Sequence, residues 1–197
     1  MNIGQDHGPS GPERLKTALG WVAFISGALA ISVEVFLHRS RSFGVRYVGM
    51  QAAAVIVIVP LYSMFWEGYD LMPLMRFLGA FLFMCFLVRL GGLVRRRRDG
   101  QKVHSRYTGY PRLMRLMPRA DERRVKGALE PVLVFFAGIF VSPTSEPLGG
   151  YLILVSVGLA VSVQLSVGYE RQRVIDMNDA YLEQRYIAER FREMRRN

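Results

Sequence analysis

Long apolar stretches alternate with short, strongly basic stretches along this chain of 197 residues. Five apolar stretches occur in order, at 17–37, 47–66, 71–94, 131–141 and 148–168. A helix of about 20 residues spans the hydrocarbon core of a bilayer, because its backbone N–H and C=O groups are paired within the helix. Four of the five stretches have that length. The pattern therefore predicts an all-α, polytopic membrane protein with about five transmembrane helices.

The fourth apolar stretch is the weakest of the five. Its uncharged run covers only Pro131–Val141 and stops at the Ser142-Pro143 pair. Either the preceding turns from Arg123 lengthen this helix, or the stretch re-enters the membrane without crossing it. The positions of the positive charges favour a crossing.

Those positive charges lie almost entirely in alternate gaps between the apolar stretches. The gaps after the first and third stretches, together with the C-terminal tail, hold 22 Lys and Arg residues, whereas the opposite side holds two. Lys and Arg accumulate in the cytoplasmic segments of membrane proteins. We therefore predict five crossings of the inner or plasma membrane, with the N-terminus outside and the C-terminus in the cytoplasm.

This topology divides the chain into five segments. We expect a polar N-terminal segment at 1–16, three transmembrane helices within 17–94, a basic cytoplasmic connection at 95–130, a transmembrane hairpin at 131–168 and a cytoplasmic amphipathic helix at 169–197.

The basic connection at 95–130 holds twelve Lys and Arg residues. Such charges attract anionic lipid headgroups, at about 1 kcal/mol for each charge near the surface. The turn-forming patch at 107–111 adds two tyrosines, and aromatic rings beside basic residues can also stack on nucleotide bases. Aromatic residues are common in membrane-proximal turns, so we favour lipid or another anionic partner over nucleic acid. The residues expected at this surface are Arg95, Arg96, Arg97, Arg98, Lys102 and Arg106.

The C-terminal tail lacks Gly and Pro from Tyr169 to Arg196 and carries one line of apolar residues. With Gln184 included, the spacing approximates a heptad seam, which predicts a helix that continues from the fifth apolar stretch. We expect this line to dock a protein partner, to pack on the basic connection, or to support self-association. It consists of Val174, Met177, Tyr181, Ala188 and Phe191.

Glu34 is the one acidic residue within the first, second, third and fifth apolar stretches. An intramembrane carboxylate is energetically costly, and it is by default a candidate functional group. His38 lies one turn later, and Arg39 and Arg41 follow. A local pair or interfacial water therefore also accounts for Glu34, and we favour that interpretation over a transport role.

The sequence carries no motif of an enzyme or of a cofactor site. It lacks Gly-x-Ser-x-Gly, His-Glu-x-x-His and the Gly-x-x-x-x-Gly-Lys phosphate loop. Its single cysteine, Cys85, and its three dispersed histidines offer no zinc-ligand spacing. We therefore expect no enzymatic activity, no cofactor and no metal site.

These observations favour a non-enzymatic accessory or scaffolding subunit of a membrane complex. It would hold partners through the basic connection and the C-terminal helix. Two alternatives stay open. One is a small transporter or channel that uses Glu34, and the other is a membrane component of a DNA- or protein-translocation machine, which requires that the basic connection bind nucleic acid.

Overall fold

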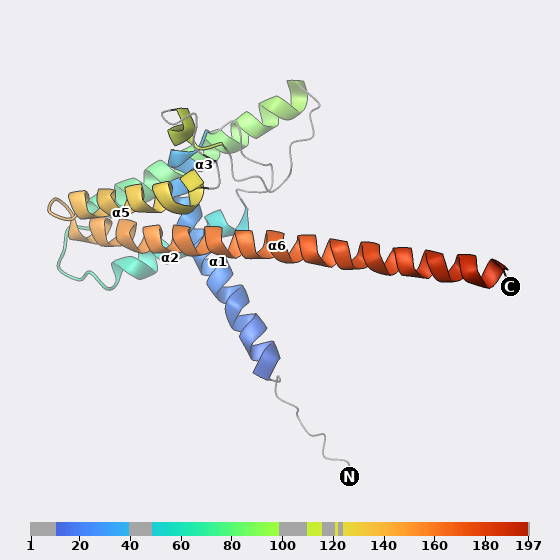
Figure 1. The fold of residues 1–197 in the computed structure, drawn as a ribbon. Helices are drawn as coiled ribbons and strands as arrows, with labels where there is room; N and C mark the ends of the chain where they lie inside the picture. Colours follow the sequence, from blue (N-terminus) through green and yellow to red (C-terminus); the bar gives the residue numbers. More distant parts are fainter. Residues whose placement is uncertain (1–10, 40–48, 99–109, 116–120, 122–123, 197) are drawn as a thin grey trace, which may run out of the picture. The chain divides into compact units, whose positions relative to one another are not determined.

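The computed structural model describes residues 11–39, 49–98, 110–115, 121 and 124–196, and the regular elements among them are all helical (Figure 1). The helices are α1 (Gly11–Leu37), α2 (Met50–Ser63), α3 (Met72–Arg98), a 3-10 turn η1 (Arg112–Arg115), a π-helical turn η2 (Val125–Leu129), α5 (Glu130–Val141) and α6 (Glu146–Arg196). The predicted all-α class is confirmed for the part of the chain that the structure describes.

Three of these helices are long and apolar enough to cross a membrane. The qualifying segments among the described residues are Arg14–Leu37 of α1, Met72–Val94 of α3 and Glu146–Arg195 of α6. The second predicted span is shorter than expected, because α2 has 14 residues and is therefore about 21 Å long against a hydrocarbon core of about 30 Å. Apolar helices compatible with membrane spans are thus present, and the count of five remains a prediction.

The chain divides into two compact units, 1–162 and 163–197. Residues 146–162 of α6 belong to the first unit, and the rest of α6 belongs to the second. The division falls within the fifth apolar stretch, whereas the sequence pattern placed the segment boundary after residue 168.

The first unit has one apolar core to which α1, α2, α3, α5 and α6 contribute. Its buried side chains include Ile31, Val55, Phe81, Val134 and Val155. Large apolar side chains on its outside are exposed, for example Phe136 and Phe140 of α5, the latter at 87%. Because water disfavours such a surface and lipid accepts it, the outside of the first unit is compatible with a membrane environment.

Four aromatic rings connect four helices of the first unit. Phe36 of α1 lies 5.7 Å from Phe77 of α3, and Phe77 lies 5.6 Å from Tyr151 of α6, measured between ring centroids. Tyr151 in turn lies 5.5 Å from Tyr62 near the end of α2. Tilted and edge-on ring pairs at this distance contribute about 0.5–1.5 kcal/mol beyond simple burial. The end of α1 therefore contacts the beginning of α3, which in turn contacts the beginning of α6.

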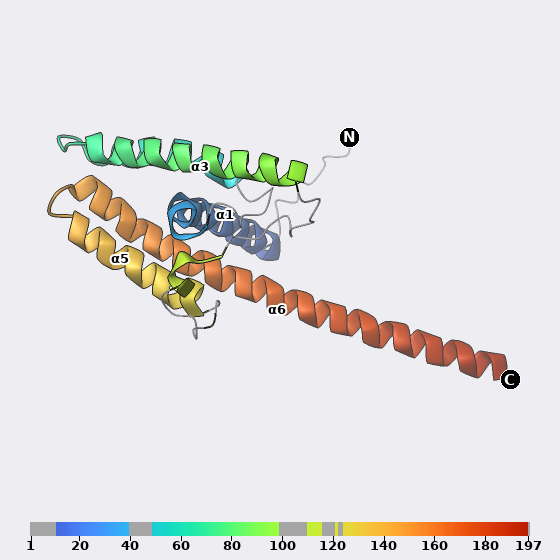
Figure 2. The same cartoon turned by 90° about the horizontal axis from the view of Figure 1, so that it is seen from above.

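The hairpin of α5 and the first part of α6 depends on two glycines. The two helices run side by side in both views (Figures 1 and 2). A Cβ atom added to Gly149 would lie 2.6 Å from the Cα atom of Ser142, and one added to Gly138 would lie 2.9 Å from the carbonyl oxygen of Gly149. Small residues permit this close backbone approach, which is how helices associate where water supplies no hydrophobic drive.

The weak fourth apolar stretch is lengthened toward its N-terminus. A helical path runs without a break from Arg124 through η2 into α5, as expected if the preceding turns lengthen this helix. Arg123, where the predicted extension begins, lies outside the described residues, and whether the helix crosses the membrane stays a prediction. The π-helical turn has a local cause, because Pro131 cannot donate to the carbonyl of Gly127 and its ring would clash there. In the wider turn, the N–H of Glu130 donates to the carbonyl of Val125.

Candidate functional site: a buried polar junction and an exposed C-terminal helix

The end of α1 meets the beginning of α5 through two buried ionisable side chains. Nε2 of His38 lies 3.0 Å from each of the two carboxylate oxygens of Glu130. His38 is 0% exposed and Glu130 is 1% exposed. The two side chains thus form a buried hydrogen-bonded pair. We call these two residues, together with Glu34, the polar junction.

Glu34 belongs to the junction because it lies one helical turn before His38 and is 4% exposed. The backbone N–H of His38 donates to the carbonyl of Glu34 at 2.9 Å. The Glu34 carboxylate lies within electrostatic range of His38, Glu130 and Lys126. Glu34 thus has three ionisable neighbours, one from α1 and two from the segment that leads into α5.

Part of the basic connection attaches to the same place. Arg112 of η1 donates a hydrogen bond from Nε to the backbone carbonyl of His38 at 3.1 Å. The backbone N–H of Arg39 donates to the carbonyl of Tyr110 at 3.1 Å, beside an isolated antiparallel bridge between His38 and Pro111. The last carbonyl groups of a helix need such partners, and a basic side chain is well suited to them. Residues 110–112 thus form a cap on the end of α1.

The predicted local pairing of Glu34 with His38 stays a prediction, and the structure adds a distant residue to this site. The His38 ring is paired with Glu130, which is 92 positions away. Sequence reasoning assigned Glu130 to the basic connection and missed it. The sequence did contain a signal, because Glu130 lies directly before Pro131, where the fourth apolar stretch begins. A carboxylate that is buried at such a position needs a polar partner.

Within the described part of the chain, no group of three or more His, Cys, Asp or Glu side chains is arranged to hold a metal ion. Cys85 has a free thiol in the middle of α3 and is half-buried. The junction consists of the His38–Glu130 hydrogen-bonded pair and the neighbouring Glu34 carboxylate.

The predicted surface cations lie mostly at or beyond the limit of the described residues. Arg95, Arg96, Arg97 and Arg98 form the last turn of α3, so this helix extends past the apolar stretch into the basic block. Lys102 and Arg106 lie outside the described residues. The hypothesis that these side chains contact anionic headgroups stays a prediction.

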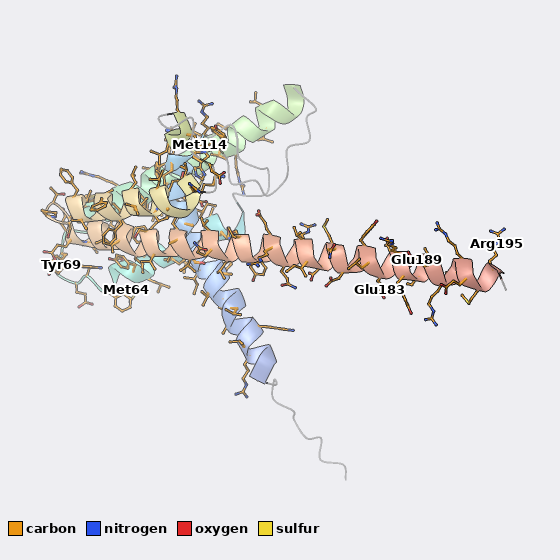
Figure 3. All side chains as sticks on the ribbon, viewed as in Figure 1. Met64, Tyr69, Met114, Glu183, Glu189 and Arg195 are labelled. Atoms are coloured by element: carbon orange, nitrogen blue, oxygen red, sulfur yellow. The ribbon has the colours of Figure 1, made fainter. Side chains whose placement is uncertain are left out.

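The second unit is a single helix, and its described side chains are exposed from Tyr169 onward. Val174, Met177, Tyr181 and Phe191 of the predicted apolar line are each 63–66% exposed, and Ala188 is exposed as well. Figure 3 shows the side chains of Glu183, Glu189 and Arg195 extending from this helix. The predicted continuous helix is confirmed.

The apolar surface of this helix is larger than the apolar line predicted from the sequence. Exposed apolar residues flank the line on both sides, and they were missed because only the heptad positions were considered. They are Ile175, Leu182, Ile187 and Met194. Polar contacts within the helix are local, with Gln172 to Asp176 and Arg185 to Glu189 both at 3.0 Å.

No protein-family model, no curated protein and no solved structure matches this chain.

Proposed function

We propose that this protein is a non-enzymatic accessory or scaffolding subunit of a membrane complex, which holds a partner through the C-terminal helix. The observation that carries this proposal is the exposed apolar line of the second unit. Tyr181 and Phe191 are 63% and 66% exposed. Burying such side chains in an interface contributes about 25 cal/mol for each Å² of apolar surface, before the loss of freedom on binding is subtracted.

The isolated helix also needs a source of stability. Most helical stability in proteins comes from packing of an apolar face rather than from intrinsic propensity. The exposed Arg185–Glu189 pair supplies only about 0.2–0.5 kcal/mol. A partner that covers the apolar line therefore supports both the shape of this helix and the docking role that we propose for it.

Truncation after Gln172 tests the proposal. The shortened chain should still insert into the membrane, because the apolar helices remain, and it should no longer retrieve partner chains in mild detergent. Tyr181→Asp together with Phe191→Asp should reproduce that loss. Equal recovery of the same partners by the truncated chain would assign docking to the basic connection instead.

A matched control exists on the same helix. Tyr186 is 60% exposed, close to the 63% of Tyr181, and five positions along a helix place it about 140° away from Tyr181. Tyr186→Asp should leave partner recovery intact while Tyr181→Asp reduces it. Equal losses for the two variants would mean that any added charge disturbs the helix.

The proposed orientation places the N-terminus outside and the C-terminus in the cytoplasm of an inner or plasma membrane, supported by the 22-to-2 distribution of positive residues. The contact of Phe36 with Phe77 restricts how α1 can lie in the membrane in this orientation. Five crossings put the end of α1 and the beginning of α3 at opposite membrane faces. For both helices to cross, α1 has to be steeply inclined, and Figures 1 and 2 show α1 running across the direction of α3.

Reporter fusions test this orientation. Fusions after Asn197 and within 98–105 should report cytoplasm, and fusions at Glu146 and ahead of Met1 should report the outside. A cytoplasmic signal at Glu146 would remove the last two crossings. A cytoplasmic signal at Met1 would mean that α1 and α2 together cross the membrane once instead of twice.

A second candidate function is a small transporter or channel that uses Glu34. The observation in its favour is the burial of Glu34 beside His38 and Glu130, because buried ionisable groups in membrane helices mark ion and proton pathways. Purified protein in vesicles should then conduct an ion or carry protons, and Glu34→Gln should abolish that flux. An unchanged flux in the variant would exclude Glu34 from the pathway.

A further inference from the structure

We propose that the partner of the C-terminal helix is a second copy of this chain, paired with the first copy in antiparallel orientation. This inference rests on the docking role proposed above and names its partner.

The apolar line is part of a longer seam with regular heptad spacing. Steps of four and three residues alternate through Val174, Met177, Tyr181, Gln184, Ala188 and Phe191. The same alternation places Glu170 four positions before the line and Arg195 four positions after it. The seam thus covers eight positions and begins and ends on opposite charges, and such a repeat is the pattern of helices that pair along their length.

An antiparallel partner matches this seam position by position. When the two copies run in opposite directions about the midpoint between Tyr181 and Gln184, Glu170 of one copy faces Arg195 of the other, and Val174 faces Phe191. Met177 then faces Ala188, and Tyr181 faces Gln184. Apolar layers therefore combine a larger with a smaller side chain, which favours even packing. An opposite-charge pair closes each end of the interface.

A parallel partner would bring like residues together. Glu170 would face Glu170, Arg195 would face Arg195, and the small Ala188 layer would adjoin a layer of two Phe191 rings. The charge along the helix gives the same preference, because residues 170–183 contain four acidic and two basic residues, whereas 185–196 contain two acidic and five basic residues. Opposite halves attract in the antiparallel pair only.

Exchange of the end charges tests the orientation. Glu170→Arg or Arg195→Glu alone should weaken dimerisation of the detergent-solubilised full chain about tenfold, because each variant converts both end pairs to like charges. The double variant Glu170→Arg with Arg195→Glu should restore it. Glu170 also interacts within its own chain, so the rescue is decisive. The two positions are 25 residues apart, about 37 Å along one helix, and cannot compensate within one copy.

Cross-linking provides an independent measurement in a Cys85→Ala background. Copies with Glu170→Cys are mixed with copies with Arg195→Cys and treated with a short thiol-to-thiol cross-linker. A cross-linked dimer that forms in the mixture, and not in either sample alone, is the expected result. Cross-linking within each separate sample would overturn the antiparallel arrangement.

The inference and the proposed function can fail separately. If no cross-link forms and the charge exchange has no effect, while truncation after Gln172 still removes other co-purifying chains, the second copy is the wrong partner and the docking role stands. If Tyr181→Asp changes neither dimerisation nor the recovery of any other chain, both proposals are wrong.

Discussion

The polar junction at the end of α1 and the exposed helix of the second unit differ in which kind of side chain they bury and which they expose. The junction buries ionisable groups, with His38 and Glu130 at 0% and 1% exposure. The helix exposes large apolar groups, with Tyr181 and Phe191 above 60%. A buried pair must be complete, because the loss of one member leaves the other without compensation for its desolvation. An exposed apolar line is free to be covered later. The first unit therefore depends on both members of the pair being present, whereas the exposed helix carries the docking role that we propose.

Removal of one member of the buried pair should have the largest effect on stability. His38→Ala leaves the Glu130 carboxylate buried without its imidazole partner, and we expect a loss of about 3–5 kcal/mol in the free energy of unfolding. Denaturant unfolding of the purified full chain in detergent measures this value. His38→Leu combined with Glu130→Leu should recover much of the loss, because neither member of the pair is then left buried without the other. A loss below about 1 kcal/mol for His38→Ala would mean that water reaches Glu130 freely.

The close approach of α5 and α6 should be next in sensitivity. A Cβ atom at Gly149 would lie 2.6 Å from the Ser142 backbone, so Gly149→Ala should destabilise the first unit by about 1–3 kcal/mol. Gly79 of α3 is a matched control, because an added Cβ atom meets nothing within 4 Å there. Gly79→Ala should leave stability unchanged or raise it by about 0.5–1 kcal/mol through helix propensity. The same unfolding measurement compares the two, and equal effects would contradict the observed contact.

The cap on α1 should contribute less than either of these. Arg112→Ala removes one hydrogen bond to the carbonyl of His38, and a loss of about 0.5–1.5 kcal/mol in unfolding free energy is expected. Arg115, exposed on the same short turn, is the control, and Arg115→Ala should change stability by less than about 0.5 kcal/mol. If both variants lose the same amount, the charge of the turn matters rather than the hydrogen bond.

The smallest effect is expected on the exposed helix. Arg185→Ala breaks a pair whose side chains are 67% and 54% exposed, so helix stability should fall by only about 0.2–0.5 kcal/mol. Thermal melting followed by circular dichroism, on the full chain at low and high salt, measures this change. The difference between wild type and variant should shrink as salt is added. A loss above about 1 kcal/mol would place Arg185 in an interface.

Local sequence patterns were sufficient to predict where most of the helices lie. Three features predicted α3, α5 and α6 within a few residues: the lengths of the apolar stretches, the lack of Gly and Pro from Tyr169 to Arg196, and the turn at Ser142 and Pro143. They also predicted the end of α1, which begins at Gly11, before the predicted start at residue 17. Helix formation depends on neighbours within one or two turns, so periodicity and breakers in the sequence report on it directly. The same reasoning overestimated the second span, because apolar composition continues past Ser63, where the helix ends.

Only the tertiary structure decided which distant groups meet. Sequence pattern singled out Glu34 and noted His38 beside it, yet the partner of His38 is Glu130, from a segment 92 positions away. The contact of Gly138 with Gly149 and the cap by Arg112 are likewise set by packing. The spacing of residues along one chain specifies which side chains share a helix face. It does not specify which other helix that face will meet, because that choice depends on the shapes and buried polar groups of all helices at once.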